Sequence, residues 1–403
     1  MPPCLFAADT ALRSANNGFV LISAALVLMM TPALALFYAG FVRSRNVLNT
    51  MVMSFAAMGL VSVLWVLFGY SLAFSPGQGP LAPFIGGLQW AGLSNWSAPY
   101  GDGQLSHGAV AFFQLTFAII TPALISGAVV ERISFRAWLL FVLLWSTVIY
   151  LPLAHMVWGP GGFLGPDGLG ALDFAGGLVV EMASGVGAAV AAAVVGSRRH
   201  HPAQVAPPHN VPFILLGAGL LWFGWFGFNG ASYFAAKGAG FSFITTSTAA
   251  SAAMLAWCLI EWFKDGKPTA VGAATGAVAG LVGITPAAGF VSIGSSILIG
   301  ALTTVACFIA VQIKAAIKFD DSLDTFMVHG VGGTTGALLT GLLAVKELVP
   351  ADYFPLSAKI LEEQGNMGML AAQFKAVLLT YGFVGIGTVV ILLIVKRSEE
   401  HTS

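Results

Sequence analysis

Long apolar stretches alternate with short polar segments along almost the whole chain. A helix needs roughly 20 residues to cross about 30 Å of hydrocarbon. Eleven stretches are long enough, or nearly so, and the pattern therefore predicts an all-α membrane protein with eleven transmembrane helices. These helices are expected near residues 18–42, 47–74, 107–130, 136–158, 174–196, 210–229, 241–263, 270–288, 291–317, 325–345 and 372–395.

Two of these stretches carry an ionisable residue in matching places. One starts with the dipeptide Leu-Asp at 172–173 and reaches Glu181, and the other starts with Leu-Asp at 323–324 and reaches His329. In both, apolar residues precede the ionisable group and glycines follow it, which lets another helix approach closely. An ionisable residue at membrane depth is costly and is a candidate for function.

His329 alone is explained equally well by a core histidine that bonds to a neighbouring carbonyl. Glu181 in the matching place favours a pair of groups that meet at a repeat interface near the middle of the membrane. The tetrapeptide Ile-Thr-Pro-Ala also occurs twice, at 120–123 and at 284–287, which supports an internal repeat.

The repeat is expected within a single membrane domain, residues 1–403. Each half has five helices, and an odd number forces the two halves into opposite orientations. Repeat 1 is expected at about 18–196, repeat 2 at about 210–345, and the eleventh helix, at about 372–395, outside the repeat.

The basic residues predict the orientation. Lys and Arg number twelve in the segments that follow odd-numbered helices and five in the alternate segments. The positive-inside rule then places the N-terminus outside and the C-terminus in the cytoplasm, for a multi-pass protein of the inner (cytoplasmic) membrane. The segment 197–209 is expected to be the cytoplasmic linker between the halves. His200 and His201 lie there beside two arginines, and a solvated loop is favoured over a metal site.

Composition argues against several classes of protein. Only 8% of residues are charged, against about 25% in soluble domains, and the net charge is zero, so no nucleic-acid partner is expected. The three cysteines have no metal-ligand spacing. The chain contains no phosphate-binding loop, zinc-protease motif or clear nucleophile elbow. We therefore expect no enzyme, no metal and no cofactor, and the start of the chain predicts no signal peptide.

Aromatic residues gather near the predicted outer ends of two helices. The sixth stretch ends in WFGWFGFNGAS at 222–232, the fourth ends in AHMVWG at 154–159, and Phe117 lies in the third. Aromatic residues near a membrane surface are usually interfacial anchors. Here the flanking glycines allow rings to crowd a pore, where their faces attract a desolvated cation with about 0.5–2 kcal/mol.

Together these residues resemble the ammonium transporter family (Amt, Mep and Rh proteins) over about residues 9–398. The resemblance rests on ALFYAG at 35–40, AHMVWG at 154–159, ALDFAGG at 171–177, GWFGFN at 224–229 and VHGV at 328–331. It implies eleven helices with an inverted five-helix repeat, assembled in the lipid bilayer as a homotrimer with one pore per subunit. It also implies that ammonium or ammonia is the substrate, with methylammonium as an analogue.

The resemblance also implies roles for residues that match by position. Phe117, Trp158 and Ser232 correspond to the outer ammonium-binding site, where the rings attract the cation and the hydroxyl accepts a hydrogen bond. Phe117 and Phe228 correspond to a stacked gate beneath this site. Asp173 corresponds to a buried aspartate that supports the site without touching the ion.

Glu181 and His329 correspond to a pore pair that most members of the family form from two histidines. Some fungal members also carry Glu at the first position. A carboxylate beside an imidazole can share a proton with it. The carboxylate also adds negative charge to a desolvated pore, where it can retain a cation.

Two functions are therefore expected. In the first, the protein transports ammonium by recruiting the cation, removing a proton and passing ammonia through a hydrophobic pore. In the alternative, it is the ammonium-binding sensor domain of a longer signalling protein with little or no flux, and its partner is a cytoplasmic regulatory or fused signalling domain. The sequence ends soon after the last expected helix, so the family's longer cytoplasmic tail is expected either to be lost or to belong to a longer protein of which this sequence is one piece.

Overall fold

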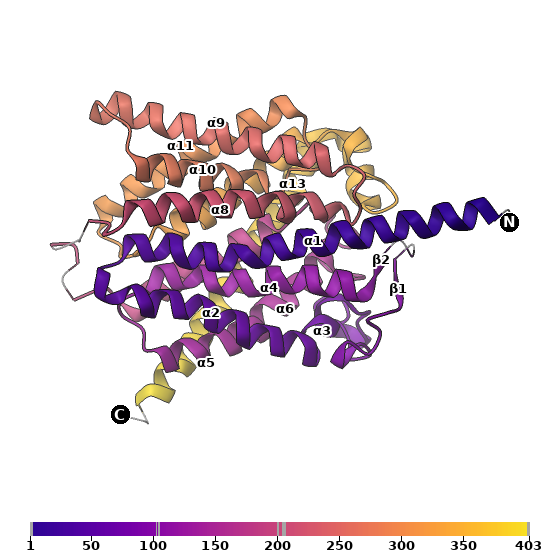
Figure 1. The fold of residues 1–403 in the computed structure, drawn as a ribbon, viewed down its shortest axis with the longest axis horizontal. Coiled ribbons are helices and arrows are strands. Elements are labelled where there is room, and N and C mark those ends of the chain that lie inside the picture. The colour runs from indigo at the N-terminus through magenta and orange to yellow at the C-terminus, as the bar shows by residue number, and fades with distance from the viewer. Residues whose placement is uncertain (1–2, 102, 104, 200, 204–206, 401–403) are drawn as a thin grey trace.

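The computed structural model describes residues 3–101, 103, 105–199, 201–203 and 207–400. Within this part of the chain, ten helical spans are long and apolar enough to cross a membrane. They lie side by side in one bundle, with the two termini at its opposite ends (Figure 1). Strands β1 (Pro99–Tyr100) and β2 (Leu105–Ser106) pair antiparallel in a long connection. The prediction of a helical membrane protein is confirmed.

The first half of the chain supplies five of these spans. Its α-helices are α1 (Pro3–Phe41), α2 (Val47–Leu64), α3 (Tyr70–Phe74), α4 (His107–Val129), α5 (Phe135–Trp145), α6 (Leu151–Trp158) and α7 (Ala183–Val195). The π-helical segments Trp65–Gly69 and Ser146–Tyr150 continue α2 into α3 and α5 into α6, and a third, Gly177–Met182, precedes α7. Such segments are rare and frequently lie at functional sites.

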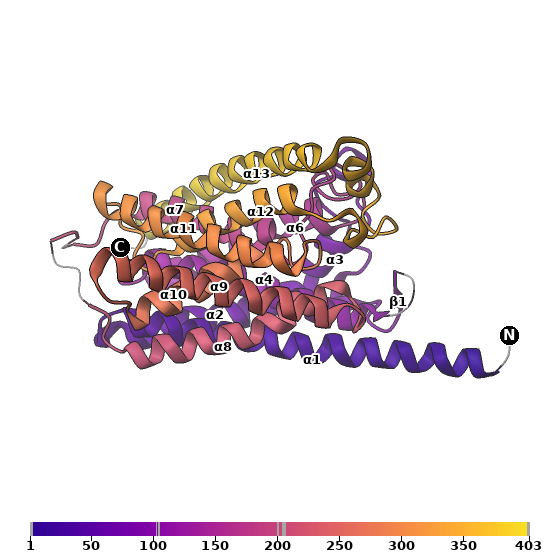
Figure 2. The ribbon, with the colours of Figure 1, turned by 90° about the horizontal axis from the view of Figure 1, so that it is seen from above.

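The second half supplies the other five spans and one shorter helix. Its α-helices are α8 (Val211–Gly230), α9 (Ala239–Asp265), α10 (Ala270–Ile284), α11 (Ile293–Ile317), α12 (Val331–Leu343) and α13 (Pro355–Glu400). The π-helical segment Phe326–Gly330 precedes α12. Short 3-10 helices lie at Ser44–Asn46, Gly79–Leu81, Ala91–Leu93, Ala231–Tyr233 and Lys346–Leu348. Figure 2 shows α13 on the face of the bundle opposite α1 and α8.

Ten of the eleven predicted stretches coincide with helices of spanning length. The exception is the stretch predicted at 270–288, where α10 has only 15 residues and gives way to turns after Ile284. Pro286 has no backbone N–H and cannot continue the helical hydrogen bonds. The same tetrapeptide at 120–123 stays inside α4 around Pro122, so the proline alone does not end the helix. The turns that follow are buried, so other parts of the protein enclose them.

The segment Gly177–Met182 with α7 packs closely against the segment Phe326–Gly330 with α12, and this packing positions Glu181 and His329. A Cβ atom added to Gly185 in α7 would lie 2.1 Å from the backbone nitrogen of Gly330. A Cβ atom at Gly333 in α12 would lie 2.9 Å from the Cβ atom of Glu181. Only glycine fits at such distances, and the two backbones can therefore approach directly. This approach brings Glu181 and the neighbouring His329 face to face.

Candidate functional site

Asp173 caps the segment that carries Glu181. Its carboxylate accepts backbone hydrogen bonds of 2.6 to 3.2 Å from Gly176, Gly177, Leu178 and Val179. The first N–H groups of a helix have no partner within the helix, so a buried acceptor fixes where the segment begins. Burial raises the pKa of the Asp173 carboxyl to about 6, although the four N–H bonds favour its charged form.

Asp321 caps the segment that carries His329 in the same way. Its carboxylate accepts hydrogen bonds from the backbone N–H groups of Thr325 (3.1 Å) and Phe326 (2.8 Å). Asp321 lies eight residues before His329, which equals the spacing from Asp173 to Glu181.

The alignment of the two Leu-Asp dipeptides, which paired Asp173 with Asp324, is therefore wrong. Asp324 instead forms an ion pair with Lys314. A cap is defined by its distance from the start of the helical segment, and the identity of the preceding residue does not determine it. The spacing to the ionisable residue was the signal in the sequence that would have identified Asp321.

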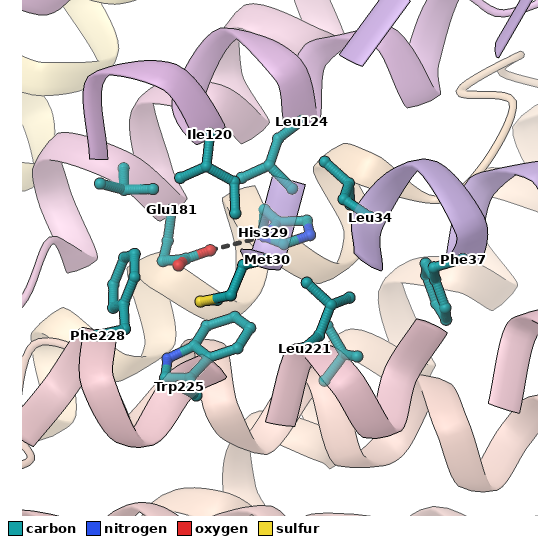
Figure 3. A pocket seen from close by; sticks show the side chains of 12 residues that line it. Met30, Leu34, Phe37, Ile120, Leu124, Glu181, Leu221, Trp225, Phe228 and His329 are labelled. Atoms are coloured by element: carbon teal, nitrogen blue, oxygen red, sulfur yellow. Dashed lines mark hydrogen bonds and ion pairs between the residues drawn. The ribbon is translucent and has the colours of Figure 1, made fainter. Parts of the chain in front are cut away.

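Glu181 and His329 touch each other inside the bundle (Figure 3). The Oε2 atom of Glu181 lies 2.6 Å from the Nδ1 atom of His329, and the two residues are 1% and 6% exposed. Apolar and aromatic side chains surround the pair, among them Met30, Leu221 and Trp225. His329 therefore bonds to a carboxylate here, whereas the alternative of a core histidine invoked a neighbouring carbonyl.

Phe117, Trp158 and Ser232 line one cavity of about 340 Å³, which we call the aromatic cavity. The Phe117 and Trp158 rings meet edge to face, with centroids 6.0 Å apart. The Ser232 hydroxyl donates to the carbonyl of Phe228 at 2.9 Å, so its oxygen lone pairs are free to accept a hydrogen bond. The residues expected to bind a cation thus surround one space, and Asp173 also lines it.

A stack of two rings separates the aromatic cavity from the Glu181–His329 pair. Phe117 and Phe228 lie 4.1 Å apart between centroids, with an angle of 24° between their planes. Phe117 lines the aromatic cavity, whereas Phe228 lines a much smaller one around the pair, the pair pocket. The pair pocket has about 10 Å³ of space, which is close to the minimum for one water molecule.

A third cavity lies on the other side of the pair. This distal cavity of about 180 Å³ is lined by His329 together with Tyr38, Trp257, Glu261 and Asp324. His329 also lines the pair pocket, so it stands between the two spaces. The aromatic cavity, the ring stack, the buried pair and the distal cavity therefore follow one another in a row through the protein.

Comparison with known families matches residues 18–400 to the Ammonium Transporter Family. The chain belongs to this family. The "Ammonium transporter" of Bacillus subtilis (strain 168) is 47% identical over 402 residues, which cover 97% of this chain and 96% of that protein. The "Ammonium transporter" of Aquifex aeolicus (strain VF5) is 44% identical and covers 97% and 89% of the two chains.

Solved structures of the same kind superpose over almost all of the chain. Mep2 of Saccharomyces cerevisiae has a TM-score of 0.84 and 36% identity, over 94% of this chain and 85% of that chain. A protein described as "Sensor Amt Protein" has a TM-score of 0.85 and 27% identity, over 96% and 94%. The architecture is therefore shared with Mep2 and with a protein described as a sensor.

In this member of the ammonium transporter family, both ring nitrogens of the histidine in the AHMVWG motif lie within hydrogen-bond distance of backbone carbonyls, and a neutral ring donates to one of them. The Nδ1 and Nε2 atoms of His155 lie 3.0 Å and 2.8 Å from the carbonyl oxygens of Ala73 and Ala82. The adjacent Trp158 donates its Nε1–H to the carbonyl of Asp173 at 3.0 Å, which fixes the indole at the cavity wall. The motif thus holds the connection that follows α3 through His155, and it fixes the orientation of the Trp158 ring.

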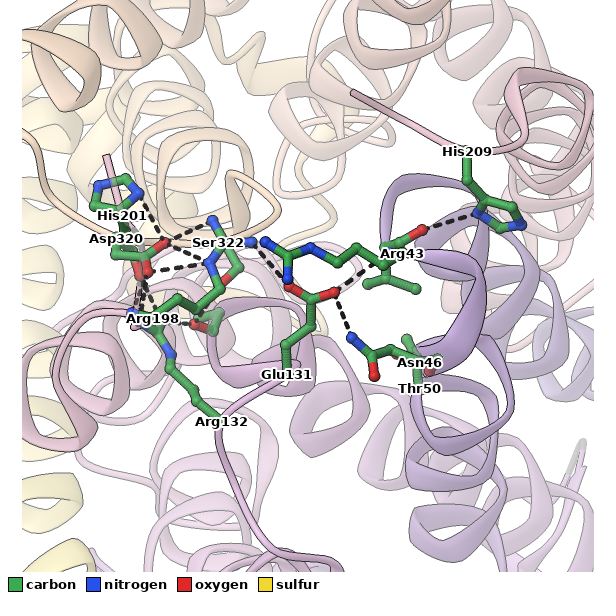
Figure 4. A network of polar contacts seen from close by, with 12 residues as sticks. Arg43, Asn46, Thr50, Glu131, Arg132, Arg198, His201, His209, Asp320 and Ser322 are labelled. Atoms are coloured by element: carbon green, nitrogen blue, oxygen red, sulfur yellow. Dashed lines mark hydrogen bonds and ion pairs between the residues drawn. The ribbon is translucent and has the colours of Figure 1, made fainter. Parts of the chain in front are cut away.

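Charged residues at the end of the bundle near the C-terminus form a network that the sequence did not predict (Figure 4). Arg198 in the linker 197–209 contacts Asp320 at 2.8 Å and Glu131 at 3.4 Å, and Arg132 contacts Asp320 at 3.0 Å. Burial alone would raise the pKa of the Asp320 carboxyl, but hydrogen bonds from Arg198 and the charge of Arg132 hold it below its usual value. The described part of the linker is largely exposed, as expected of a solvated loop, but acidic partners from distant segments hold the half-buried side chain of Arg198.

The metal-site alternative for the linker involved His200 and His201. His200 lies outside the described residues. The Nε2 atom of His201 lies 3.2 Å from the carbonyl oxygen of Lys318, and its Nδ1 atom lies 3.6 Å from Asp320. Over the ranges that the structure describes, no group of three or more His, Cys, Asp or Glu side chains is placed to hold a metal ion.

Proposed function

We propose that this chain transports ammonium across the cytoplasmic membrane as a multi-pass protein. The observation that carries the proposal is the row formed by an aromatic cavity, a ring stack and a buried ionisable pair. Membership of the Ammonium Transporter Family and relatives described as ammonium transporters support it. The Sensor Amt Protein is less similar, with 27% identity against 47% for the Bacillus subtilis relative, and the transporter is therefore our first choice.

Ammonium binds first in the aromatic cavity. Trp158 and Phe117 offer ring faces that attract a cation, each with about 0.5–2 kcal/mol depending on how far water is removed. Ser232 accepts one N–H of the cation with its hydroxyl oxygen. These contacts replace part of the hydration shell, so the cation can leave bulk water. Methylammonium has the same charge and keeps three N–H groups, and it therefore serves as an analogue.

The ring stack of Phe117 and Phe228 forms a gate that opens by ring rotation. Side-chain motions of this kind are fast compared with domain movements. Beyond the gate, Glu181 and His329 form a proton relay. Ammonium gives up one proton and becomes ammonia, the proton enters the shared Glu181–His329 hydrogen bond, and ammonia passes the apolar walls as a neutral molecule. No covalent bond to the protein forms, and ammonium regenerates when both reach the far side.

The orientation follows from the connections around the two larger cavities. Tyr100 and Phe354, which line the aromatic cavity, belong to connections expected outside. Thr269 and Asp324, which line the distal cavity, belong to connections expected in the cytoplasm. We therefore propose an N-terminus outside, a cytoplasmic C-terminus and inward movement of ammonium.

The proposed architecture is an inverted five-helix repeat plus one further helix. The matching caps support it, because Asp173 and Asp321 stand eight residues before Glu181 and His329. With α10 counted as a short span, each half contributes five helices, and α13 stands outside the repeat. Assembly as a homotrimer with one pore per subunit follows from the family resemblance, and many large apolar side chains exposed on the bundle provide surfaces for lipid and for neighbouring subunits.

The test of this function compares flux with binding in the same preparation. Purified protein in proteoliposomes should give a current when ammonium is added on one side, and empty liposomes should give none. Calorimetry on the purified protein should show ammonium binding. Binding without current would overturn the transporter and leave the sensor, whereas an absence of both would overturn the aromatic cavity as an ammonium site.

A further inference from the structure

Arg132 joins the ends of two helices to a loop at the end of the bundle near the C-terminus (Figure 4). It follows α4 closely, and its side chain is only 7% exposed. The guanidinium donates to the carbonyl of Gly196, the residue after α7, at 2.6 Å, and also to the carbonyl of Ala128 in α4. The same group pairs with the Asp320 carboxylate at 3.0 Å, in the loop before the segment Phe326–Gly330.

The bond to Gly196 holds the helix that carries Glu181. α7 continues the segment Gly177–Met182 in one helical span, and Gly196 follows the last residue of that span. A helix is a rigid element, so a bond at its end fixes how far the whole helix is shifted along the bundle. Arg132 therefore helps to set the position of Glu181, although the two side chains do not touch.

Asp320 connects Arg132 to the other member of the pair. It directly precedes Asp321, whose carboxylate caps the segment that carries His329. The Asp320 side chain is 1% exposed, pairs with Arg132 and Arg198, and accepts the backbone N–H of Arg198 at 2.7 Å. The two adjacent aspartates thus bond to different elements. Asp321 holds its own segment, whereas Asp320 holds the ends of α4 and α7.

We propose that Arg132 is a positioning residue for the Glu181–His329 pair. This inference rests on the proposed function, because it concerns the proton relay. The contact of Gly185 with Gly330 lets the two segments come close, but van der Waals contact is not directional and resists sliding only weakly. Arg132 supplies directional bonds that oppose such a shift. A misplacement of about 1 Å can cost roughly a hundredfold in rate, so a distant residue can control the relay.

Arg132→Gln removes the guanidinium bridge, and full-length protein in proteoliposomes shows the effect. The maximal ammonium-driven current per folded protein should fall about tenfold. The affinity for ammonium, measured by calorimetry, should change less than twofold, because Arg132 does not line the aromatic cavity. A general structural defect would not separate the two quantities in this way.

Arg132→Lys is the conservative variant. Lysine keeps a positive charge beside Asp320, but it donates from a single nitrogen, whereas the guanidinium donates from Nη1 and from Nη2. The melting temperature should stay near that of the wild type, and the maximal current should lie between those of the wild type and of Arg132→Gln. If Arg132→Gln does not fold, a lower current in Arg132→Lys carries the test, and a wild-type current there overturns the inference.

Asn46 provides a matched control in the same network. Its amide donates to Glu131 at 2.6 Å, and within the described part of the chain its side chain has no bond to α7 or to Asp320. Asn46→Ala should lower the melting temperature by a few degrees, because it leaves the carboxylate with one donor fewer. The current per folded protein should remain that of the wild type.

A double-mutant cycle shows whether Arg132 acts through the pair. In a Glu181→Gln background the relay is already lost, so Arg132→Gln should reduce the residual current less than twofold further. Two losses that multiply would mean that Arg132 acts independently of Glu181, and they would overturn the inference.

The outcomes separate this inference from the proposed function. Wild-type current in folded Arg132→Gln, together with reduced current in Glu181→Gln, would overturn the role of Arg132 and leave the relay in place. An equal loss of current in Arg132→Gln and Asn46→Ala would show a general effect of the network on stability and would also overturn it. If the wild type binds ammonium but carries no current, the inference falls together with the proposed transporter.

Discussion

At the scale of single residues, the contact between Glu181 and His329 holds two costly groups at membrane depth. A buried charge without a partner would be strongly unfavourable, and the 2.6 Å contact lets one proton satisfy both side chains. Most members of the family are expected to carry two histidines at these positions. An ionised Glu181 beside a neutral His329 has one more negative charge than two neutral histidines. In the proposed transport mechanism, this pair receives the proton that ammonium gives up.

Glu181→Gln should reduce the ammonium-driven current in proteoliposomes by at least about tenfold, which corresponds to about 1.4 kcal/mol on the barrier. Glutamine keeps the size and polarity of the side chain but removes the charge and the proton site. Glu181→His, the control, forms the pair that is commoner in the family and should retain part of the current. Equal currents in the wild type and in Glu181→Gln would refute the proton relay.

Trp158→Ala and Phe117→Ala should each weaken methylammonium binding several-fold, because the loss of one cation–π face costs about 1 kcal/mol. Calorimetry on the purified variants measures this directly. Trp96 is 64% exposed and does not line the aromatic cavity, so Trp96→Ala is a suitable control and should bind normally. If both cavity variants bind like the wild type, the rings serve only for packing.

Several candidate site residues were predictable because they belong to short motifs or to an internal sequence repeat. Phe117 and Trp158 came from the family resemblance, and His329 and Glu181 from the repeated pattern around them. Asp321 was missed because the two halves were aligned by a shared dipeptide, whereas capping depends on distance to the helical segment. The pairing of Arg198 with Asp320 joins residues 122 positions apart, and no local pattern encodes such a contact.

At the scale of elements, the approach of α7 to the segment Phe326–Gly330 aligns the pair. The two backbones touch at Gly185 and Gly330. They can come this close only because neither residue has a side chain. The sequence predicted this approach from the glycines that follow each ionisable residue. It did not predict that both ionisable residues lie in π-helical segments, since no pattern of apolar residues distinguishes these from α-helix.

Gly185→Val should abolish ammonium-driven current and lower the melting temperature, because the new side chain would meet the backbone of Gly330 and separate Glu181 from His329. Gly219 in α8 has nothing within 4 Å of an added Cβ atom. Gly219→Ala is therefore the matched control and should leave both current and stability unchanged or slightly improved. Normal current in Gly185→Val would show that the close approach is not required.

At the scale of the whole molecule, the termini lie at opposite ends of the bundle (Figure 1). The excess of basic residues in alternate connections, twelve against five, supports our proposal that the N-terminus lies outside and the C-terminus in the cytoplasm. The bundle itself was predictable from the apolar stretches alone. The bend of α13 at Gly365, where φ is 64°, was not predicted, because an isolated glycine in a helical pattern is compatible with a straight helix as well.

Single cysteines introduced at Ser197 and Gly266 should react with a membrane-impermeant reagent only from the cytoplasmic side, and one at Gly103 only from outside. The background should carry serine in place of Cys258 and alanine in place of Cys307, with Cys4 also replaced. A protein without any cysteine measures the unspecific signal. Labelling at Gly103 and Ser197 from the same side would contradict both the orientation and the inverted repeat.

The ring stack of Phe117 and Phe228, together with the very small pair pocket behind it, has an electrical consequence. If water fills the aromatic and distal cavities and conducts, most of the membrane voltage falls across the narrow stretch between them, where the pair pocket has only about 10 Å³ of space. One elementary charge that crosses this stretch gains or loses about 2.3 kcal/mol for every 100 mV. A proton that passes from the aromatic cavity through the Glu181–His329 pair to the distal cavity would then experience nearly the full driving force of the membrane.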